Sequence, residues 1–207
     1  MHGLVGESPV QDAKREAILK HARTAFVTEG YAATRMEPIA REAGVSTATL
    51  YALFSGKAEL YSAVIDAAGD DFARRMAHVR AIEGDAREAL TSFAEAYADF
   101  MGDVFVRSIF RLVVAERPRF QAVASGLFEK GQAAIGATLI DTLKRLSEAG
   151  QIKPLEHPSW AAGQLVGMIE HPVFFVSLVT GEEIRIRRTR KQIVDDAVET
   201  FLARYGT

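Results

Sequence analysis

The stretch that decides the fold is TRMEPIAREAGVSTATLYALFSGK, residues 34–57. Ala43–Val45 forms a three-residue break with a central glycine, and a short apolar pattern of helical spacing lies on each side of it. Ser46 is a good N-cap for a helix over Thr47–Phe54, on which Leu50 and Phe54 share one face. The stretch therefore predicts two short helices joined by a tight turn.

The segments around this stretch predict further helices. The T-x-x-E pair Thr34 and Glu37 predicts a capping box that opens the first short helix, which ends at Glu42. A preceding helix is expected over Gln11–Glu29, with Gly30 as the residue that ends it. A long helix is expected over Lys57–Arg80, after the break at Ser55 and Gly56.

The rest of the chain repeats the helical apolar period, and we find no alternating β-strand pattern. The sequence therefore predicts an all-α protein, with an N-terminal helix-turn-helix domain at residues 1–56 and a larger helical domain at residues 57–207. Glycines at 126, 131 and 136 predict a bend in the longest later span. The five later spans are Asp85–Met101, Val104–Glu116, Pro118–Ala149, Ser159–Leu178 and Arg187–Arg204.

Composition excludes several classes of protein. The 207 residues are 48% apolar and 25% charged, which is typical of a folded chain rather than a disordered one. The longest stretch without a charged residue is Ala43–Gly56, 14 residues, too short for a membrane span. The chain contains no Cys, and its first ten residues do not resemble a secretion signal. We therefore expect no membrane contact, no disulfide, no cofactor and a cytoplasmic location.

The helix-turn-helix spacing is compatible with DNA binding. Small and hydroxyl side chains at Thr47, Ala48, Tyr51 and Ala52 would face outward and fit a major groove. A generic helical hairpin has the same spacing, however, and the net charge of −2 gives no overall attraction to DNA. Residues 1–57 hold seven basic and six acidic side chains, so local charge leaves both readings open.

A family resemblance separates these readings. The stretch Ile18–Leu60 resembles the N-terminal domain of the TetR family of transcriptional regulators, with A-G-V-S-x-x-x-L-Y-x-x-F followed by Lys as the most specific part. Its further matching residues are Ile18, Ala22, Phe26, Gly30, Tyr31, Ala33, Thr34, Ile39 and Ala40.

The resemblance implies that residues 47–52 form the recognition helix. It implies that Thr47 and Ala48 lie near base edges, that Tyr51 bonds a phosphate, and that Thr34 and Lys57 hold the DNA backbone. The chain departs from the family at Ala52 and Gly56, so base readout at position 52 would be weak or apolar. The predicted DNA-binding residues are Thr34, Arg35, Ser46, Thr47, Ala48, Tyr51, Ala52 and Lys57.

TetR-like proteins dimerise through their last two long helices, which would be Ser159–Leu178 and Arg187–Arg204 here. Gly163 and Gly167 independently favour a close helix approach, although an internal core helix stays possible. The basic residues Arg185, Arg187, Arg188, Arg190 and Lys191 favour a solvated surface. The predicted dimer residues are Trp160, Gly163, Gly167, Phe174, Leu178, Val194, Val198 and Phe201.

Aromatic residues on the middle helices suggest a cavity for an apolar or aromatic effector, although aromatic stripes usually form core. Tyr97 or His171 would give the polar contact, and an interface role for His171 stays open. Residues 111–120, RLVVAERPRF, faintly resemble the C-terminal region of AefR-like members. The predicted effector residues are Phe93, Tyr97, Phe110, Phe128, Met168, His171 and Phe175.

Taken together, these patterns predict a homodimeric regulator that binds a near-palindromic operator. We expect a repressor that a small hydrophobic effector releases, and no enzyme. An enzyme has little support, because phosphate-loop, G-x-S-x-G and H-E-x-x-H motifs are missing and the five His have no metal-ligand spacing. A helical adaptor without DNA affinity is the second alternative.

Overall fold

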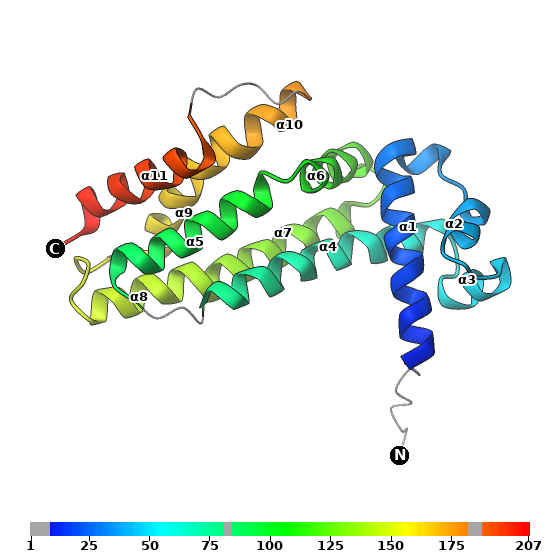
Figure 1. The fold of residues 1–207 in the computed structure, drawn as a ribbon, viewed down its shortest axis with the longest axis horizontal. Helices are drawn as coiled ribbons and strands as arrows, with labels where there is room; N and C mark the ends of the chain where they lie inside the picture. The colour runs from blue at the N-terminus through cyan, green and yellow to red at the C-terminus, as the bar shows by residue number, and fades with distance from the viewer. Residues whose placement is uncertain (1–8, 81–83, 182–187) are drawn as a thin grey trace, which may run out of the picture. The chain divides into compact units, whose positions relative to one another are not determined.

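The computed structural model describes residues 9–80, 84–181 and 188–207, and every regular element in these ranges is helical (Figure 1). The all-α prediction is confirmed. The elements are α1 (Pro9–Ala33), α2 (Met36–Glu42), α3 (Thr47–Leu53), α4 (Lys57–Arg80), α5 (Ala86–Met101), α6 (Val104–Glu116), α7 (Gln121–Ile135), the π-helical turn η1 (Gly136–Ile140), α8 (Asp141–Glu148), α9 (Pro158–Glu170), the π-helical turn η2 (His171–Phe175), α10 (Val176–Thr180) and α11 (Arg190–Tyr205).

The chain divides into two compact units. The head unit runs up to Ala67 and also contains Leu112–Ala124, whereas the body unit contains Ala68–Arg111 and residues 125–207. The sequence places the boundary after residue 56, where a glycine break starts α4. Such a break marks where a helix starts, not where a compact unit ends. The first part of α4, as far as Ala67, belongs to the head unit.

The core of the head unit is built from α1, α2, α3 and the start of α4. Ile18, Phe26, Leu50 and Phe54 are fully buried, as the helical spacing predicts. Gly30 interrupts α1 with φ 78° and ψ 165°, a backbone conformation that glycine adopts without a steric penalty. The chain direction therefore changes just before Tyr31, whose ring is buried in the same core.

The core of the body unit is formed by α5, α9 and α11, and α11 packs against both of the others. The apolar stripe of α11 faces this core. Val194, Val198 and Phe201 have exposed fractions of 1%, 0% and 1%. Their prediction as dimer residues was therefore wrong, because their side chains are consumed by packing inside their own chain.

Two π-helical turns interrupt longer helical runs in the body unit. The predicted bend in the span after Pro118 corresponds to η1, which begins at Gly136, and Thr138 Oγ1 donates to the Met76 carbonyl across 3.2 Å. In η2, Pro172 has no N–H and its ring crowds the carbonyl four residues earlier, so a wider turn is favoured there.

One helical run, Pro158–Thr180, is long and apolar enough to cross a membrane by length and composition. The sequence argument missed it, because that argument counted only uninterrupted uncharged stretches and Glu170 lies within this run. Core helices of soluble proteins satisfy the same criterion, and Leu165 and Ile169 are fully buried in the body core.

Candidate nucleic-acid interface

The turn between α2 and α3 depends on Gly44. Its φ of 68° lies in the left-handed region, where a side chain is strained. The Gly44 N–H donates to the Arg41 carbonyl at 3.1 Å, and the Val45 N–H donates to the Ala40 carbonyl at 3.0 Å. These bonds end α2 in the manner of a Schellman motif and fix the direction in which α3 begins.

The helix α3, which was predicted to be the recognition helix, is fixed at its N-terminus and along its inner face. Ser46 Oγ accepts a hydrogen bond from the Thr49 N–H at 3.0 Å and lies 2.8 Å from Thr49 Oγ1. Leu50 is fully buried beneath the helix. The structure therefore places Ser46, a predicted DNA-binding residue, as the cap that orients α3.

The outer face of α3 is uncharged and uncovered within the head unit. Thr47, Ala48 and Ala52 are exposed, and the Tyr51 side chain is 46% exposed. Hydroxyl groups can bond phosphates or base edges, and an alanine methyl can contact the thymine methyl. This face can therefore approach a base-pair edge without first losing contacts inside the protein.

Thr34 and Lys57 are hydrogen-bonded inside the head unit. Thr34 is 1% exposed, and its hydroxyl donates to the Gly30 carbonyl at 2.7 Å. Lys57 Nζ donates to the carbonyls of Ala32 and Thr34 at 3.0 and 2.9 Å. These bonds brace the segment between α1 and α2. The Thr34 hydroxyl is therefore buried away from the surface, whereas Lys57 keeps a third N–H donor and stays a predicted contact to the DNA backbone.

The capping box predicted from Thr34 and Glu37 is also wrong. The helix α2 begins at Met36, its N-cap is Arg35, and no side chain caps it. Because the Thr34 hydroxyl bonds backward to α1, it is not available to a forward cap. Arg35 itself is exposed at the start of α2.

An aromatic cluster of Tyr31, Tyr61 and Phe120 lies in the head unit, and sequence reasoning missed it. Phe120, which follows α6, has its ring centroid 4.6 Å from that of Tyr61 and 4.9 Å from that of Tyr31. Burial, with a contribution from the charge of Glu116, raises the pKa of Tyr61 to about 12. Arg119 lies over the Tyr31 ring, 4.7 Å from its centroid. The only sequence signal for this cluster is the stretch 111–120, whose faint family resemblance says nothing about packing.

The predicted effector residues differ in burial. Phe93 and Tyr97 are buried and stack with centroids 5.8 Å apart, and Phe110 packs edge-on against Phe174. In contrast, Phe128 is 66% and Phe175 is 52% exposed. Helical periodicity did not predict this difference in burial, because it identifies the apolar face of a helix but not the helix that packs against that face. Of the remaining two, Met168 is half-buried and His171 is exposed.

Tyr97 connects α5 to the end of α9 through a hydrogen bond with Glu170. Burial raises the pKa of the Glu170 carboxyl, and the hydrogen bond from Tyr97 partly opposes that rise. Burial also raises the pKa of the Tyr97 hydroxyl, and the neighbouring Glu170 charge adds to the effect. The predicted polar group at Tyr97 is thus already paired inside the body unit.

The predicted dimer residues separate into an exposed and a buried group. Trp160 is 69% exposed, and Gly163 and Gly167 are exposed with open space where a Cβ would lie. Phe174 is buried in the body core, so its prediction as a dimer residue was wrong. Leu178 is half-buried. We call the exposed set Trp160, Gly163, Gly167, His171 and Phe175 the α9 face.

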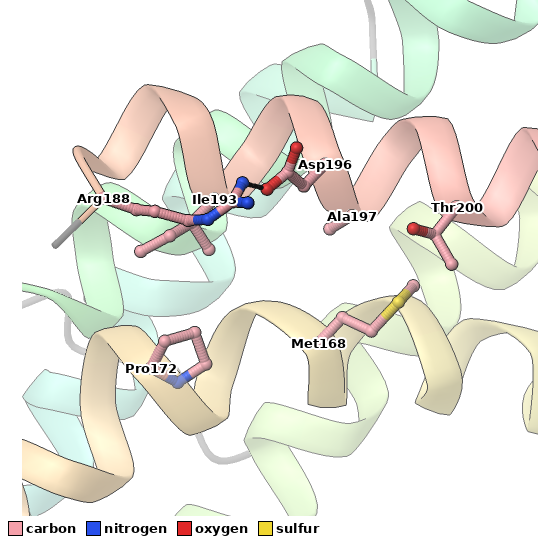
Figure 2. Close-up of a pocket in the computed structure, with 7 residues that line it drawn as sticks. All are labelled: Met168, Pro172, Arg188, Ile193, Asp196, Ala197 and Thr200. Carbon is pink, nitrogen blue, oxygen red and sulfur yellow. Dashed lines mark ion pairs between the residues drawn. The ribbon is translucent and has the colours of Figure 1, made fainter. Parts of the chain in front are cut away.

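A groove lies beside the α9 face, and the sequence gives no direct sign of it. Figure 2 shows side chains of α11 opposite Met168 and Pro172, and an ion pair between Arg188 and Asp196 on the α11 side. The volume of the groove is about 220 Å³. The lining residues are Met168, Pro172, Arg188, Ile193, Asp196, Ala197 and Thr200.

The basic run before α11 lies on the surface where it is described. Arg190 Nη1 is 2.8 Å from Asp99 Oδ1, and Lys191 Nζ is 2.7 Å from Asp195 Oδ2. The hydrogen bond and charge of Asp195 raise the pKa of Lys191. Arg185 and Arg187 lie outside the described residues. Within residues 9–80, 84–181 and 188–207, no group of three His, Asp or Glu residues is arranged to hold a metal ion.

Comparisons with known proteins agree with this architecture. The family described as bacterial regulatory proteins, tetR family, matches residues 18–64, and the AefR-like transcriptional repressor C-terminal domain matches residues 88–207. The HTH-type transcriptional activator FasR of Mycolicibacterium smegmatis is 37% identical over 91 residues, 44% of this chain and 42% of that protein. The chain therefore matches less than half of the length of this curated relative.

Solved structures are similar over almost the whole chain. A structure assigned to the TetR-family regulators of Mesorhizobium loti MAFF303099 has a TM-score of 0.83 and 26% identity, covering 97% of this chain and 100% of that one. The Flavonoid-responsive Regulator FrrA has a TM-score of 0.73 and 27% identity, covering 93% and 97%. Because two family patterns match and one of them covers more than half of the sequence, the chain belongs to the TetR family of transcriptional regulators.

Proposed function

We propose that this regulator binds a near-palindromic operator as a homodimer, with one copy of α3 in each of two successive major grooves. The observation that carries the proposal is the uncharged outer face of α3, which is exposed while its cap and inner face are fixed. In such an arrangement the two recognition helices read half-sites about 34–36 Å apart. The proposal also places the protein in the cytoplasm, where bacterial DNA is accessible to it.

Different residues of the head unit take different roles in this proposal. Thr47 and Ala48 read base edges, Tyr51 bonds a phosphate, and exposed Arg35 adds an electrostatic contact to the DNA backbone. Ser46 acts indirectly by capping α3, and Thr34 by holding the segment between α1 and α2. Lys57 holds the same segment with two of its N–H donors and offers the third to a phosphate. Ala52 contributes at most an apolar contact.

We propose repression as the regulatory outcome, with release by a small apolar or aromatic effector bound in the body unit. The match of residues 88–207 to an AefR-like repressor domain supports repression. The relative FasR is described as an activator, so the direction needs its own test. FrrA is described as flavonoid-responsive, which makes flavonoids the first aromatic compounds to test. A coupling of about 1–3 kcal/mol between effector and operator would change affinity roughly 5- to 150-fold.

The experiment is a selection of bound fragments from a randomised DNA pool by the purified full chain at two salt concentrations. We expect an inverted repeat and a fall in affinity with salt, because phosphate contacts release counterions. Thr47→Ala should change base preference at one position by about 1–3 kcal/mol, whereas Tyr51→Phe should weaken binding to all sequences about equally.

The matched control is Thr28→Ala, which removes an exposed threonine hydroxyl from α1 of the same head unit. Identical sequence profiles for Thr47→Ala and Tyr51→Phe would contradict the assignment of base and phosphate roles. A chain that enriches no sequence at either salt, with or without flavonoids, would favour the adaptor alternative. Transcription from a promoter that carries the selected site, measured with and without the effector, separates repression from activation.

A further inference from the structure

Trp160 is an unusual side chain to leave uncovered. It is the only tryptophan of the chain, and 69% of its surface is exposed at the start of α9. Tryptophan is enriched among the residues that contribute most to binding near the centres of protein interfaces, where they lie in well-packed pockets. Gly163 and Gly167, the next positions on the same face, have open space where a Cβ would lie. A second helix can therefore approach α9 closely at this point.

The groove beside the α9 face lies at the distance that a two-fold contact requires. If two copies of α9 cross in opposite directions with their closest approach midway between Gly163 and Gly167, position 160 of one helix lies opposite position 170 of the other. Position 170 falls between Met168 and Pro172, the two groove residues contributed by α9 and η2. Both positions are five residues, about 7.5 Å, from the crossing point.

We propose that the indole of Trp160 inserts into the groove of a second copy of this chain, and that the second copy inserts its own Trp160 in return. The inference rests on the proposed homodimer and specifies how its two chains interlock. In an isologous contact each chain must offer both the inserting residue and the recess. Here the same continuous surface offers both.

The chemistry of the groove matches an indole ring. Four of its lining residues are apolar, Met168, Pro172, Ile193 and Ala197, and a methionine sulfur packs well against an aromatic ring. Arg188, which is ion-paired with Asp196, also lines the groove, and a guanidinium can stack on the face of an aromatic ring.

The groove also offers the indole N–H a partner. Thr200 and Asp196 present oxygen atoms that can accept its hydrogen bond, which a buried tryptophan requires. In size, a closed cavity of about 150 Å³ can hold benzene. The groove volume of about 220 Å³ therefore leaves room for the larger indole.

The test uses the fluorescence of the sole tryptophan in the full chain, together with sedimentation to measure the oligomeric state at each concentration. We expect the emission maximum to shift to shorter wavelength and acrylamide quenching to decrease as dimer forms. Trp160→Ala should weaken dimerisation by at least about 30-fold, as truncation of a buried interface tryptophan does. Trp160→Phe should retain part of the affinity, because it keeps the ring but loses the N–H donor.

A second variant blocks the groove without touching Trp160. Thr200→Arg should restore the exposed emission of Trp160 and weaken the dimer, whereas Ala203→Arg adds the same side chain to α11 outside the groove lining and should have a much smaller effect. A dimer whose Trp160 stays fully quenchable, or in which both arginine variants behave alike, overturns the groove contact and leaves the proposed homodimer standing. A chain that stays monomeric at all concentrations and on operator DNA overturns both.

Discussion

The helices α9 and α11 were both predicted to form the dimer surface, and the structure assigns them different positions. The apolar stripe of α11, with Val194, Val198 and Phe201, is buried in the core of its own body unit. In contrast, α9 leaves Trp160 and two glycines exposed. A stripe of large aliphatic and aromatic residues thus indicated a core here. Glycines on the same face as one large aromatic residue indicated a surface that the chain leaves uncovered.

The largest effect that would sharpen this comparison is expected from Phe201→Ala. Because Phe201 is 1% exposed, its truncation should lower the free energy of unfolding by about 3–5 kcal/mol. Urea denaturation at low protein concentration measures this change, and Trp160→Ala is the control because it removes a comparable ring from the exposed face of α9. Equal losses for the two variants would show that Trp160 is packed in the monomer as tightly as Phe201.

A second test concerns the close approach of α9 to a partner. Gly167→Leu fills the open space beside the α9 face and should raise the dimer dissociation constant about 5- to 150-fold, which corresponds to overpacking by about 1–3 kcal/mol. Analytical ultracentrifugation measures it. The same substitution at Gly126, which also has open space at its Cβ position but lies on α7, should change dimerisation much less. Similar changes at both positions would remove α9 as the site of close approach.

A smaller effect, a gain in stability rather than a loss of affinity, is expected for a substitution at Gly167 in the monomer. Gly167→Ala should raise the free energy of unfolding of the monomer by about 0.5–1 kcal/mol, because alanine favours a helix and meets no atom within 4 Å at this position. Thermal or urea unfolding below the dimerisation range gives the value. Gly126→Ala should give a similar gain, so a loss at position 167 alone would indicate that its surroundings are closed already in the monomer.

The smallest expected effect concerns the attachment of α9 to α5 through Tyr97 and Glu170. Burial raises the pKa of Glu170, so the folded chain retains this proton at a pH where the unfolded chain has lost it. The unfolding free energy should therefore decline as pH rises from the unfolded value of about 4.3 through the folded pKa.

The substitution Glu170→Gln should remove that part of the decline and make the variant relatively more stable toward neutral pH. Urea denaturation from about pH 4 to 8 tests it. Glu129→Gln on α7, which removes an exposed carboxylate, is the matched control. A stability difference between Glu170→Gln and the unsubstituted chain that is constant across this range would contradict the stated role of burial.

Local sequence signals were sufficient for much of the fold. The start and end of α4 and of α6, and the cap at Ser46, follow from breakers and capping residues that act over a few positions. The same locality explains the wrong capping box at Thr34 and the unpredicted carbonyl contacts of Lys57. Their hydrogen bonds reach Gly30, Ala32 and each other's segment across folded turns, and nothing in the linear pattern reports those partners.

The exposure of the outer face of α3 was predictable, because it follows from the buried positions of Ile39 and Leu50 on two short helices. The burial of individual aromatic residues on the middle helices was not, because it depends on which helices meet and at what rotation. Phe93 and Phe128 were both predicted to contact an effector, yet one is buried and the other is 66% exposed. Only the packing of the helices separates them.

The π-helical turn η2 constrains how this protein can change in length. A π-turn contains one residue more than the corresponding α-helical path, so deleting a single residue within His171–Phe175 would allow the run from Pro158 to Thr180 to become a regular α-helix. Every later position would then keep its present helix face, because the wider turn already absorbs the extra residue. Ser177, now buried, and Val179, now 67% exposed, would keep their surroundings, whereas a deletion in the α-helical part of the same run would rotate every later position by about 100°.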